Sequence, residues 1–420
     1  MSTAPAMEPR PTRKVLGFTW PERVTPAERR SLVAGGLGWM LDAMDVMLYS
    51  MVLAHLMKDL GMAKETAGLL NSLTLLASAV GGLLFGFLAD RIGRTRSLML
   101  SILVYSVASG ACGLSDTVIE LAILRFVLGL GMGGEWATGA ALIAETWPAE
   151  HRGKALGLMQ STWAIGEVVA AAVAGYVLPR FGWRAVFFVG ILPALLVFWI
   201  RRDVPESTVW LERGRGQRGS LRLLLRPDVR WNGLLATAMN AAGMFGYWGL
   251  FTWIPAYLSL PVEQGGRGLD IFKTTTWLVV MGVGKWLGYA LFGFFADSAG
   301  RRRSYVVYLF TAAALVPLYG MASRPTWLLI LGPFVAFFGT GFFSGFSALA
   351  AELFPTEIRA TAMGLTYNVG RGVSAAAPWI VGHLADRFGL GSAFFLQAGA
   401  FFVAGLLALA LPETRGKALE

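Results

Sequence analysis

The stretch GFLADRIGR at residues 86–94 recurs as GFFADSAGR at residues 293–301, so that position 90 is repeated at position 297, an offset of 207 residues. Three further pairs keep this offset. They join Ala144-Glu145 to Ala351-Glu352, Arg180-Phe181-Gly182 to Arg387-Phe388-Gly389, and Pro205-Glu206 to Pro412-Glu413. Matches that hold one register along the chain indicate an internal duplication. The sequence therefore predicts two related halves in the same orientation.

The composition indicates that these halves lie in a membrane. Hydrophobic residues make up 55% of the 420 residues and charged residues only 15%, and the mean hydropathy is +0.58. Soluble domains carry more charge than this. Apolar stretches of about 20 residues, the length that crosses a bilayer as a helix, recur along the chain. The expected spans are 31–54, 66–89, 97–115, 118–142, 155–178, 184–201, 232–259, 275–296, 304–322, 326–350, 361–384 and 392–411.

These spans define the predicted architecture, which is an all-α membrane protein with twelve transmembrane helices in two pseudo-symmetric six-helix bundles. The stretch that joins the bundles is too polar to enter hydrocarbon. We expect the protein to be a monomer. The predicted parts are an N-terminal cytoplasmic tail (1–30), the first bundle (31–202), a cytoplasmic linker (203–230), the second bundle (231–411) and a C-terminal cytoplasmic tail (412–420).

The net charge of +10 reflects orientation in the membrane. If the N-terminus is cytoplasmic, about 25 Lys and Arg residues lie in cytoplasmic segments and about 8 lie outside, which is the asymmetry typical of membrane proteins. This pattern predicts a multi-pass protein of the plasma (inner) membrane with both termini in the cytoplasm. The lipid bilayer is thus its expected partner, and nucleic acid is not.

Few residues of the kind that form catalytic or metal centres are present. The chain has one cysteine, Cys112, three histidines and no phosphate-binding loop. An intrachain disulfide is excluded, and an enzyme is not expected. We expect no metal and no cofactor, with the proton as coupling ion. A membrane sensor that does not transport stays an alternative.

The repeated loop, Gly-x-x-x-Asp-Arg-x-Gly-Arg, resembles a motif of the major facilitator superfamily, and so does RFVLGLGMGG at residues 125–134. The resemblance extends from about residue 30 to 415. Two shorter motifs, LDAMD at 41–45 and YNVGR at 367–371, are similar to those of proton-coupled organic-acid carriers, including the aromatic-acid, sialate and nicotinate groups. The resemblance implies a transporter with two six-helix bundles.

The repeated loops are expected to gate the cytoplasmic side. A carboxylate at a helix end can bind an arginine or the positive end of a neighbouring helix and so latch two helices together. In the second copy, Ser298 replaces the arginine found at position 91, which weakens the expectation there. The predicted gating residues are Gly86, Asp90, Arg91, Gly93, Arg94, Glu145 and Arg152 in the first half and Asp297, Gly300, Arg301, Glu352 and Arg359 in the second.

Small residues predict one close helix contact. Gly129 and Gly133 are four residues apart and therefore lie on one face of the expected fourth helix. Glycines at this spacing let two helix backbones approach each other closely. We expect the fourth helix to pack against a neighbour through this face.

Several ionisable residues lie inside the expected spans, where each costs roughly 2.5–3.5 kcal/mol and demands a partner or a wet cavity. At the repeat offset Asp42 corresponds to Gly249, and Arg371 corresponds to Ala164, so these charges are not duplicated. We infer that the two halves have different tasks. The residues concerned are Asp42, Asp45, Arg125, Glu135, Glu167, Lys285 and Arg371.

The acids are the candidates for proton coupling. Asp42 and Asp45 are three apart on one helical face, where two negative charges compete and one favours a proton. We prefer Asp45 as the proton carrier, with Glu135 as a second group and Arg125 as the counter-ion.

The buried bases are the candidates for substrate binding. Arg371 could hold a carboxylate through two parallel hydrogen bonds, and Lys285 could add a point charge. A structural ion pair between Glu167 and Lys285 is an equally good interpretation. Polar and aromatic side chains are expected to complete the pocket, namely Gln160, Trp163, Tyr247, Trp248, Tyr367 and Asn368, together with Trp39 and Tyr49.

The predicted function is proton-coupled symport of a small organic anion, a carboxylate, by alternating access. In this hypothesis protonation neutralises the acids and the substrate neutralises Arg371, which lowers the cost of closing the cavity. A carrier of a neutral sugar or an organic cation is the alternative. It would use the acids and aromatic residues directly.

Overall fold

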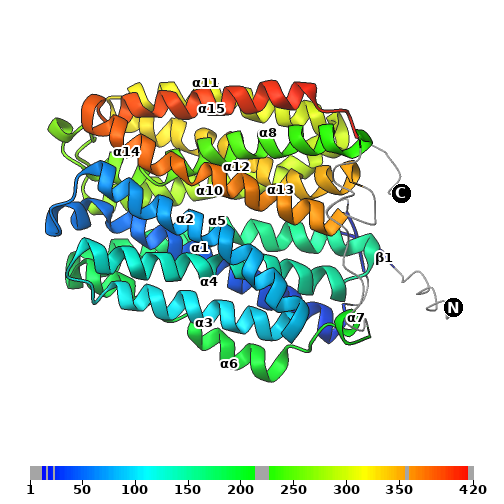
Figure 1. The fold of residues 1–420 in the computed structure, drawn as a ribbon. Helices are drawn as coiled ribbons and strands as arrows, with labels where there is room; N and C mark the ends of the chain where they lie inside the picture. The colour runs from blue at the N-terminus through cyan, green and yellow to red at the C-terminus, as the bar shows by residue number, and fades with distance from the viewer. Residues whose placement is uncertain (1–11, 16–17, 22–23, 213–226, 355–358, 415–420) are drawn as a thin grey trace.

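The computed structural model describes residues 12–15, 18–21, 24–212, 227–354 and 359–414, which form a bundle of long helices lying side by side (Figure 1). The predicted all-α membrane architecture is confirmed. The strands in the described residues are β1 (Thr12–Val15) and β2 (Phe18–Pro21), a short antiparallel pair before the first helix. This pair falls in the segment predicted as a tail.

The first helix begins at Pro26, before the expected span 31–54, because the sequence there caps a helix. The Thr25 hydroxyl accepts a hydrogen bond from the Glu28 backbone at 3.2 Å, and the Glu28 carboxylate accepts one from the Thr25 backbone at 2.8 Å. Such a reciprocal cap satisfies two free amide groups. The helices of this half are α1 (Pro26–Asp59), α2 (Lys64–Ile92), α3 (Arg94–Cys112), α4 (Val118–Thr146), α5 (Ala149–Val189) and α6 (Ala194–Asp203).

The second half follows a short helix α7 (Thr208–Glu212), which lies in the predicted linker. Its first long helix starts at Pro227, within that predicted linker. The remaining elements are α8 (Pro227–Phe251), α9 (Ile254–Ser259), the 3-10 turn η2 (Val262–Gln264), α10 (Ile271–Ala299), α11 (Arg301–Met321), α12 (Pro325–Leu353), α13 (Arg359–Ser374), α14 (Ala376–Phe388) and α15 (Leu390–Ala410).

Some crossings of the bundle consist of more than one helical piece. Gly182, with a φ of 77°, divides α5 so that its last turns and α6 together form the sixth crossing. Similarly, α8 with α9 forms the seventh and α13 with α14 the eleventh. The described residues thus cross the bundle twelve times, six times in each half. Eight of the helical stretches are long and apolar enough by themselves to span a membrane.

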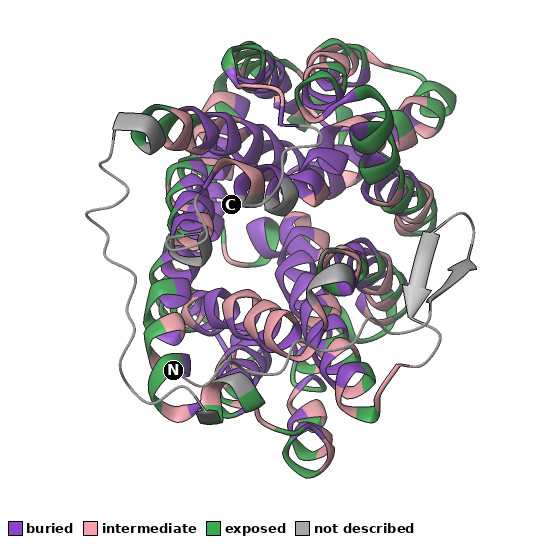
Figure 2. Ribbon diagram, turned by 90° about the vertical axis from the view of Figure 1, so that its right-hand side faces the viewer, coloured by how far each residue is buried: buried purple, intermediate pink, exposed green. Residues whose placement is uncertain are grey.

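The two ends of the bundle differ. The start of α1, the end of α15 and α7 lie at one end, which we call the termini end (Figure 1). The opposite end, where α1 stops and α2 begins, is called the distal end. Large apolar side chains are exposed, for example Phe198 at 73% and Ile123 at 60%. Figure 2 shows exposed residues on the outer surfaces of the helices. A surface of this kind fits a lipid environment.

Small residues hold the helices of the first half close together. A Cβ at Gly129 would overlap the backbone carbonyl of Thr74 in α2, and one at Gly133 would overlap that of Ser78. The predicted close contact of the fourth helix is therefore present, and α2 is its partner. Between the halves, α2 packs against α13 and α14, and α5 packs against α10.

Candidate functional site

A small cavity of about 10 Å³ lies between the two halves, and we call it the central cavity. Its walls come from α1 and α5 of the first half and from α8, α10, α12 and α13 of the second. Most of its lining is aromatic, which suits a flat apolar body. The lining residues are Trp39, Gln160, Trp163, Tyr247, Trp248, Tyr289, Phe343, Tyr367 and Arg371.

Arg371 is the charged residue of this lining. Its side chain lies 5.3 Å from the Tyr367 ring centroid, and the residue is 2% exposed. Its Nε donates no hydrogen bond within the described residues, and Arg371 belongs to none of the salt bridges there. A buried charge without a salt bridge is costly. The cavity therefore offers a guanidinium that an anion can bind.

Two buried carboxylates lie within electrostatic range of Arg371. Asp42 of α1 and Glu135 of α4 are both 0% exposed, and each interacts with the other and with Arg371. All four carboxylate oxygens lack a hydrogen-bond donor among the described residues. Glu135 lies against Gly38 of α1, where a Cβ would overlap its carboxylate. The chemistry available to such a pair is to bind and release a proton.

Asp45 lies in a different environment from Asp42. Its Oδ1 accepts a hydrogen bond from the Ser109 hydroxyl of α3 at 3.1 Å. The same oxygen lies against Gly190, in the turn before α6, where a Cβ would come within 2.5 Å. Asp45 therefore faces the interior of the first half and does not line the central cavity.

Arg125 lies near Asp45 and contacts α1 and α2. Its Nη2 donates to the Asn71 side chain at 2.9 Å, and its guanidinium lies 4.0 Å from the centre of the Tyr49 ring. Asn71 in turn donates to the Thr252 hydroxyl of the second half at 2.9 Å. Tyr49, expected in the pocket, instead holds this arginine by a cation–π contact.

Glu167 and Lys285 form an ion pair that joins the halves, as one of the two interpretations expected. They line a second small cavity, of about 20 Å³, which we call the distal chamber. The other lining residues of the chamber are Met47, Met51, Phe251, Ile254, Pro255, Leu278, Met281 and Gly282. Lys285 lies outside the lining of the central cavity, where it was expected to bind substrate.

Six of the eight substrate-binding residues predicted from the sequence line the central cavity, and the exceptions are Lys285 and Asn368. The Asn368 side chain lies against Gly82 of α2 and donates to the Gly364 carbonyl at 2.9 Å. Sequence reasoning missed Tyr289 and Phe343. Tyr289 follows Lys285 by four residues, so helical spacing could have placed it on the same face.

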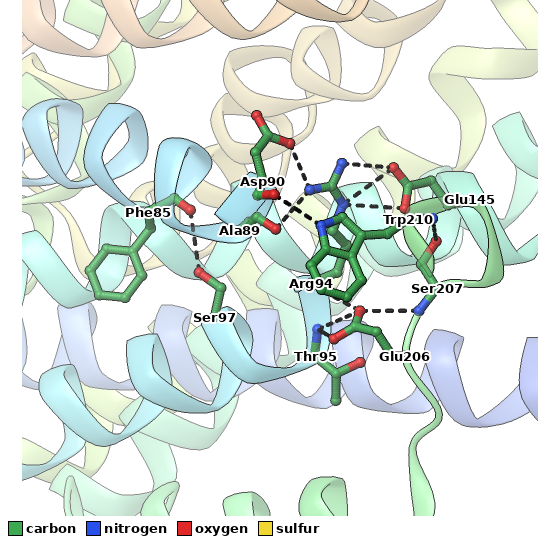
Figure 3. A network of polar contacts seen from close by, with 10 residues as sticks. All are labelled: Phe85, Ala89, Asp90, Arg94, Thr95, Ser97, Glu145, Glu206, Ser207 and Trp210. Carbon is green, nitrogen blue, oxygen red and sulfur yellow. Dashed lines mark hydrogen bonds and ion pairs between the residues drawn. The ribbon is translucent and has the colours of Figure 1, made fainter. Parts of the chain in front are cut away.

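The loop between α2 and α3 forms a network at the termini end, which we call the first latch (Figure 3). Arg94 pairs with Glu145 of α4 at 3.0 Å and with Asp90 at 2.6 Å. Glu206, which follows α6, accepts hydrogen bonds from the backbone of Arg94 at 2.8 Å and of Thr95 at 3.2 Å. The side chain of Glu206 thus caps α3, a role that sequence reasoning did not assign to it.

The second half repeats this arrangement at the same offset, and we call it the second latch. Arg301 pairs with Asp297 and, at 3.2 Å, with Glu352, while Glu413 accepts from the Arg301 backbone at 2.8 Å. Gly93 and Gly300 both have φ near +105°, at 104° and 105°, a region that glycine enters without strain. Each latch joins helices of its own half.

Several predicted gating residues lie outside the latches. Arg91 lies over the Phe87 ring at 4.1 Å, and the corresponding residue of the second copy is Ser298. Arg152 is exposed, and open space surrounds the Cβ position of Gly86. The side chain of Arg359 lies outside the described residues.

Contacts between the halves hold the distal end together, and sequence reasoning missed them. Asp386 of α14 accepts hydrogen bonds from the backbone of Glu65 at 3.0 Å and of Lys64 at 3.4 Å. It caps the start of α2, where Ala63 provides no side-chain cap. Glu65 also accepts from Trp379 at 3.1 Å and contacts His383 at 3.0 Å. Polar residues at helix ends carry no sequence signal for such pairing.

Comparisons with known proteins agree with this geometry. The model of the family described as "Major Facilitator Superfamily" matches residues 36–270 and 267–419. The chain is 34% identical to a "Probable 4-methylmuconolactone transporter" from Cupriavidus pinatubonensis, over 96% of this chain and 95% of that protein. It is 31% identical to a sialic acid transporter from Escherichia coli, over 92% and 94% of the two chains. In fold, it resembles the crystal structure of a D-xylose-proton symporter, with a TM-score of 0.76, 20% identity and coverage of 94% and 100%.

Proposed function

Because the chain belongs to the major facilitator superfamily and is therefore a transporter, not an enzyme, we propose that its cargo is a small carboxylate carried together with protons. The observation that carries this proposal is Arg371. A buried guanidinium without an ion-pair partner in the described chain lines an aromatic cavity between the halves. A carboxylate bound there would neutralise the charge through two parallel hydrogen bonds.

Asp42 and Glu135 are our candidates for the proton site. Both are buried without hydrogen-bond donors in the described residues, and both lie within electrostatic range of Arg371. Protonation removes a charge that burial disfavours. Substrate and proton thus bind to one cluster, formed by Arg371, Asp42 and Glu135. When both acids are protonated and neutral, an anion can bind at Arg371 without repulsion from them. Asp45, our first choice from the sequence, has Ser109 as its hydrogen-bond partner instead.

The aromatic lining of the cavity favours a flat substrate. Trp39 and Trp163 lie 4.6 Å apart between ring centroids, and Trp163 meets Trp248 at 6.0 Å. Gln160 is the one neutral polar residue without an aromatic ring in the lining. A planar unsaturated carboxylate would pack against such a lining better than a polyhydroxylated sugar, because rings bury apolar area and stack. This supports the carboxylate proposal over the sugar alternative.

Alternating access would move the two halves around this cavity. In the described arrangement the halves are joined at the distal end by Asp386 and Glu65, so substrate would exchange at the termini end. The two latches would keep the helices of each half together during the motion. The distribution of Lys and Arg supports a cytoplasmic termini end and insertion in the plasma (inner) membrane. We propose a monomer, since each half contributes to one cavity within a single chain.

Uptake by proteoliposomes tests the proposal. The panel contains benzoate, nicotinate, cis,cis-muconate, sialic acid and xylose, each with and without an inward proton gradient. We expect at least one carboxylate to accumulate only with the gradient, and its amide neither to accumulate nor to compete. Arg371→Gln should abolish uptake, whereas the exposed Arg180→Gln is the matched control. Gradient-driven accumulation of xylose without competition by any acid would refute the proposal.

A further inference from the structure

One carboxylate, that of Glu167, lies between the central cavity and the distal chamber and binds residues of both. Its Oε1 accepts a hydrogen bond from Trp163 Nε1 at 2.8 Å and another from the Tyr247 hydroxyl at 2.7 Å. Its Oε2 pairs with the Lys285 ammonium. Trp163 and Tyr247 line the central cavity, and Glu167 and Lys285 line the distal chamber. Glu167 therefore stands behind the cavity wall.

The two residues that Glu167 holds determine the positions of other aromatic rings. Trp163 contacts Trp39 at 4.6 Å, and Tyr247 contacts Trp248 at 5.1 Å and Phe343 at 5.0 Å between ring centroids. These rings line the same cavity. A change in the orientation of Trp163 or Tyr247 would thus alter most of the aromatic wall.

Lys285 holds Glu167 from the opposite half. It extends from α10, whereas Glu167 extends from α5, and its ammonium lies 3.7 Å from the centre of the Phe251 ring. An isolated carboxylate at this depth would be costly, and the neighbouring lysine offsets that cost. Because the pair crosses between the halves, the wall has this form only when α5 and α10 lie as they do here.

We infer that Glu167 is a positioning residue for substrate, which acts through Trp163 and Tyr247, and that Lys285 holds Glu167 instead of binding the substrate. This inference rests on the proposed carboxylate transport. In this role Glu167 serves as the hydrogen-bond acceptor for Trp163 and Tyr247 in the cavity wall. A pair that only joins the halves would need the two opposite charges but not this acceptor.

Two double variants separate these roles. Both carry Lys285→Met; one adds Glu167→Gln, which keeps a side-chain oxygen acceptor, and the other adds Glu167→Met, which has none. Both are electrically neutral at the pair, and volume-matched apolar replacement of a buried ion pair is usually tolerated. The binding constants for benzoate and nicotinate are measured by calorimetry on monodisperse protein, and uptake kinetics are measured in proteoliposomes.

We expect the glutamine variant to bind within about threefold of wild type and the methionine variant to bind on the order of tenfold more weakly, because hydrogen bonds to the wall are lost. The change should raise KM more than it lowers the maximal rate. Tyr247→Phe should weaken binding in the glutamine variant but add little in the methionine variant, since the two positions act through one hydrogen bond. If the methionine variant does not fold, Glu167→Leu with Lys285→Met replaces it.

Equal affinity of the two double variants would overturn the inference, whether both bind well or both bind poorly. Wild-type protein that binds none of the carboxylates in the uptake panel would overturn the proposed function, and the inference with it. The two failures are therefore distinguishable from the same set of measurements.

Discussion

Removal of the Asp386 carboxylate should open the distal end of the molecule. Asp386 caps α2 from the other half through the backbone amides of Lys64 and Glu65, and it lies 3.5 Å from the Lys64 ammonium. A helix cap contributes about 0.5–2 kcal/mol, and a partly exposed ion pair adds about 0.2–1 kcal/mol. The cap exists only while the halves are in contact at this end. Asp386→Ala should therefore shift the equilibrium toward distal opening by about 1–2 kcal/mol, or five- to thirtyfold.

Labelling of a cysteine in the distal chamber measures this shift. The single native cysteine, Cys112, is buried and is replaced by serine, and Met51→Cys places a thiol in the chamber lining. A membrane-impermeant maleimide applied from the distal side should label Asp386→Ala about five- to thirtyfold faster than its parent. Asp116→Ala is the matched control, because Asp116 pairs at 2.9 Å with Arg184 of its own half. Equal labelling rates for Asp386→Ala and Asp116→Ala would refute the reasoning.

Other substitutions test the proton site, the latches and the packing. Asp42→Asn and Glu135→Gln should abolish gradient-driven accumulation but keep substrate exchange, and Asp45→Asn should have a smaller effect. Counterflow and uptake assays compare the three variants. A larger effect of Asp45→Asn would place the proton site at Asp45. Arg94→Gln should lower the free energy of unfolding by about 1.5–3 kcal/mol through lost charged hydrogen bonds, whereas Arg91→Gln should not. The Tm of each variant is measured in detergent. Equal Tm values for the two variants would contradict a stabilising role of the first latch. Gly133→Ala should destabilise the protein by about 1–3 kcal/mol because the new Cβ meets the α2 backbone. Gly86→Ala should not, because the space around that position is open. Thermal unfolding compares the two variants.

The sequence predicts the architecture well because its signals are strong and repeated. The apolar spans follow from hydropathy, and the offset of 207 residues, from Asp90 to Asp297, predicts two equivalent halves. The same offset already pairs Glu206 with Glu413, but their role in capping α3 and α11 becomes evident only when loops distant in sequence come together. The helix interruptions at Gly182 and beyond Arg371 are local features that a hydropathy average does not resolve.

The candidate site is less predictable, since residue type and depth do not determine which neighbour a side chain meets. Asp42 and Asp45 share a helical face by spacing, yet one lies in range of Arg371 and the other hydrogen-bonds Ser109 within the first half. Lys285 has the right charge and depth for a substrate ligand, but Glu167 of the opposite half holds it. Pairing across the two halves depends on their docking, which no short motif records.

The central claim is that Arg371 binds the carboxylate of the substrate. Calorimetric titration of one acid and its amide tests this claim most directly. Nicotinate and nicotinamide differ in this group alone, and wild-type protein should bind the acid while binding of the amide is at least tenfold weaker, a difference of about 1.4 kcal/mol. Arg371→Gln should bind both alike and weakly. Binding of the amide as tight as that of the acid, or an unchanged preference for the acid in Arg371→Gln, would contradict the account.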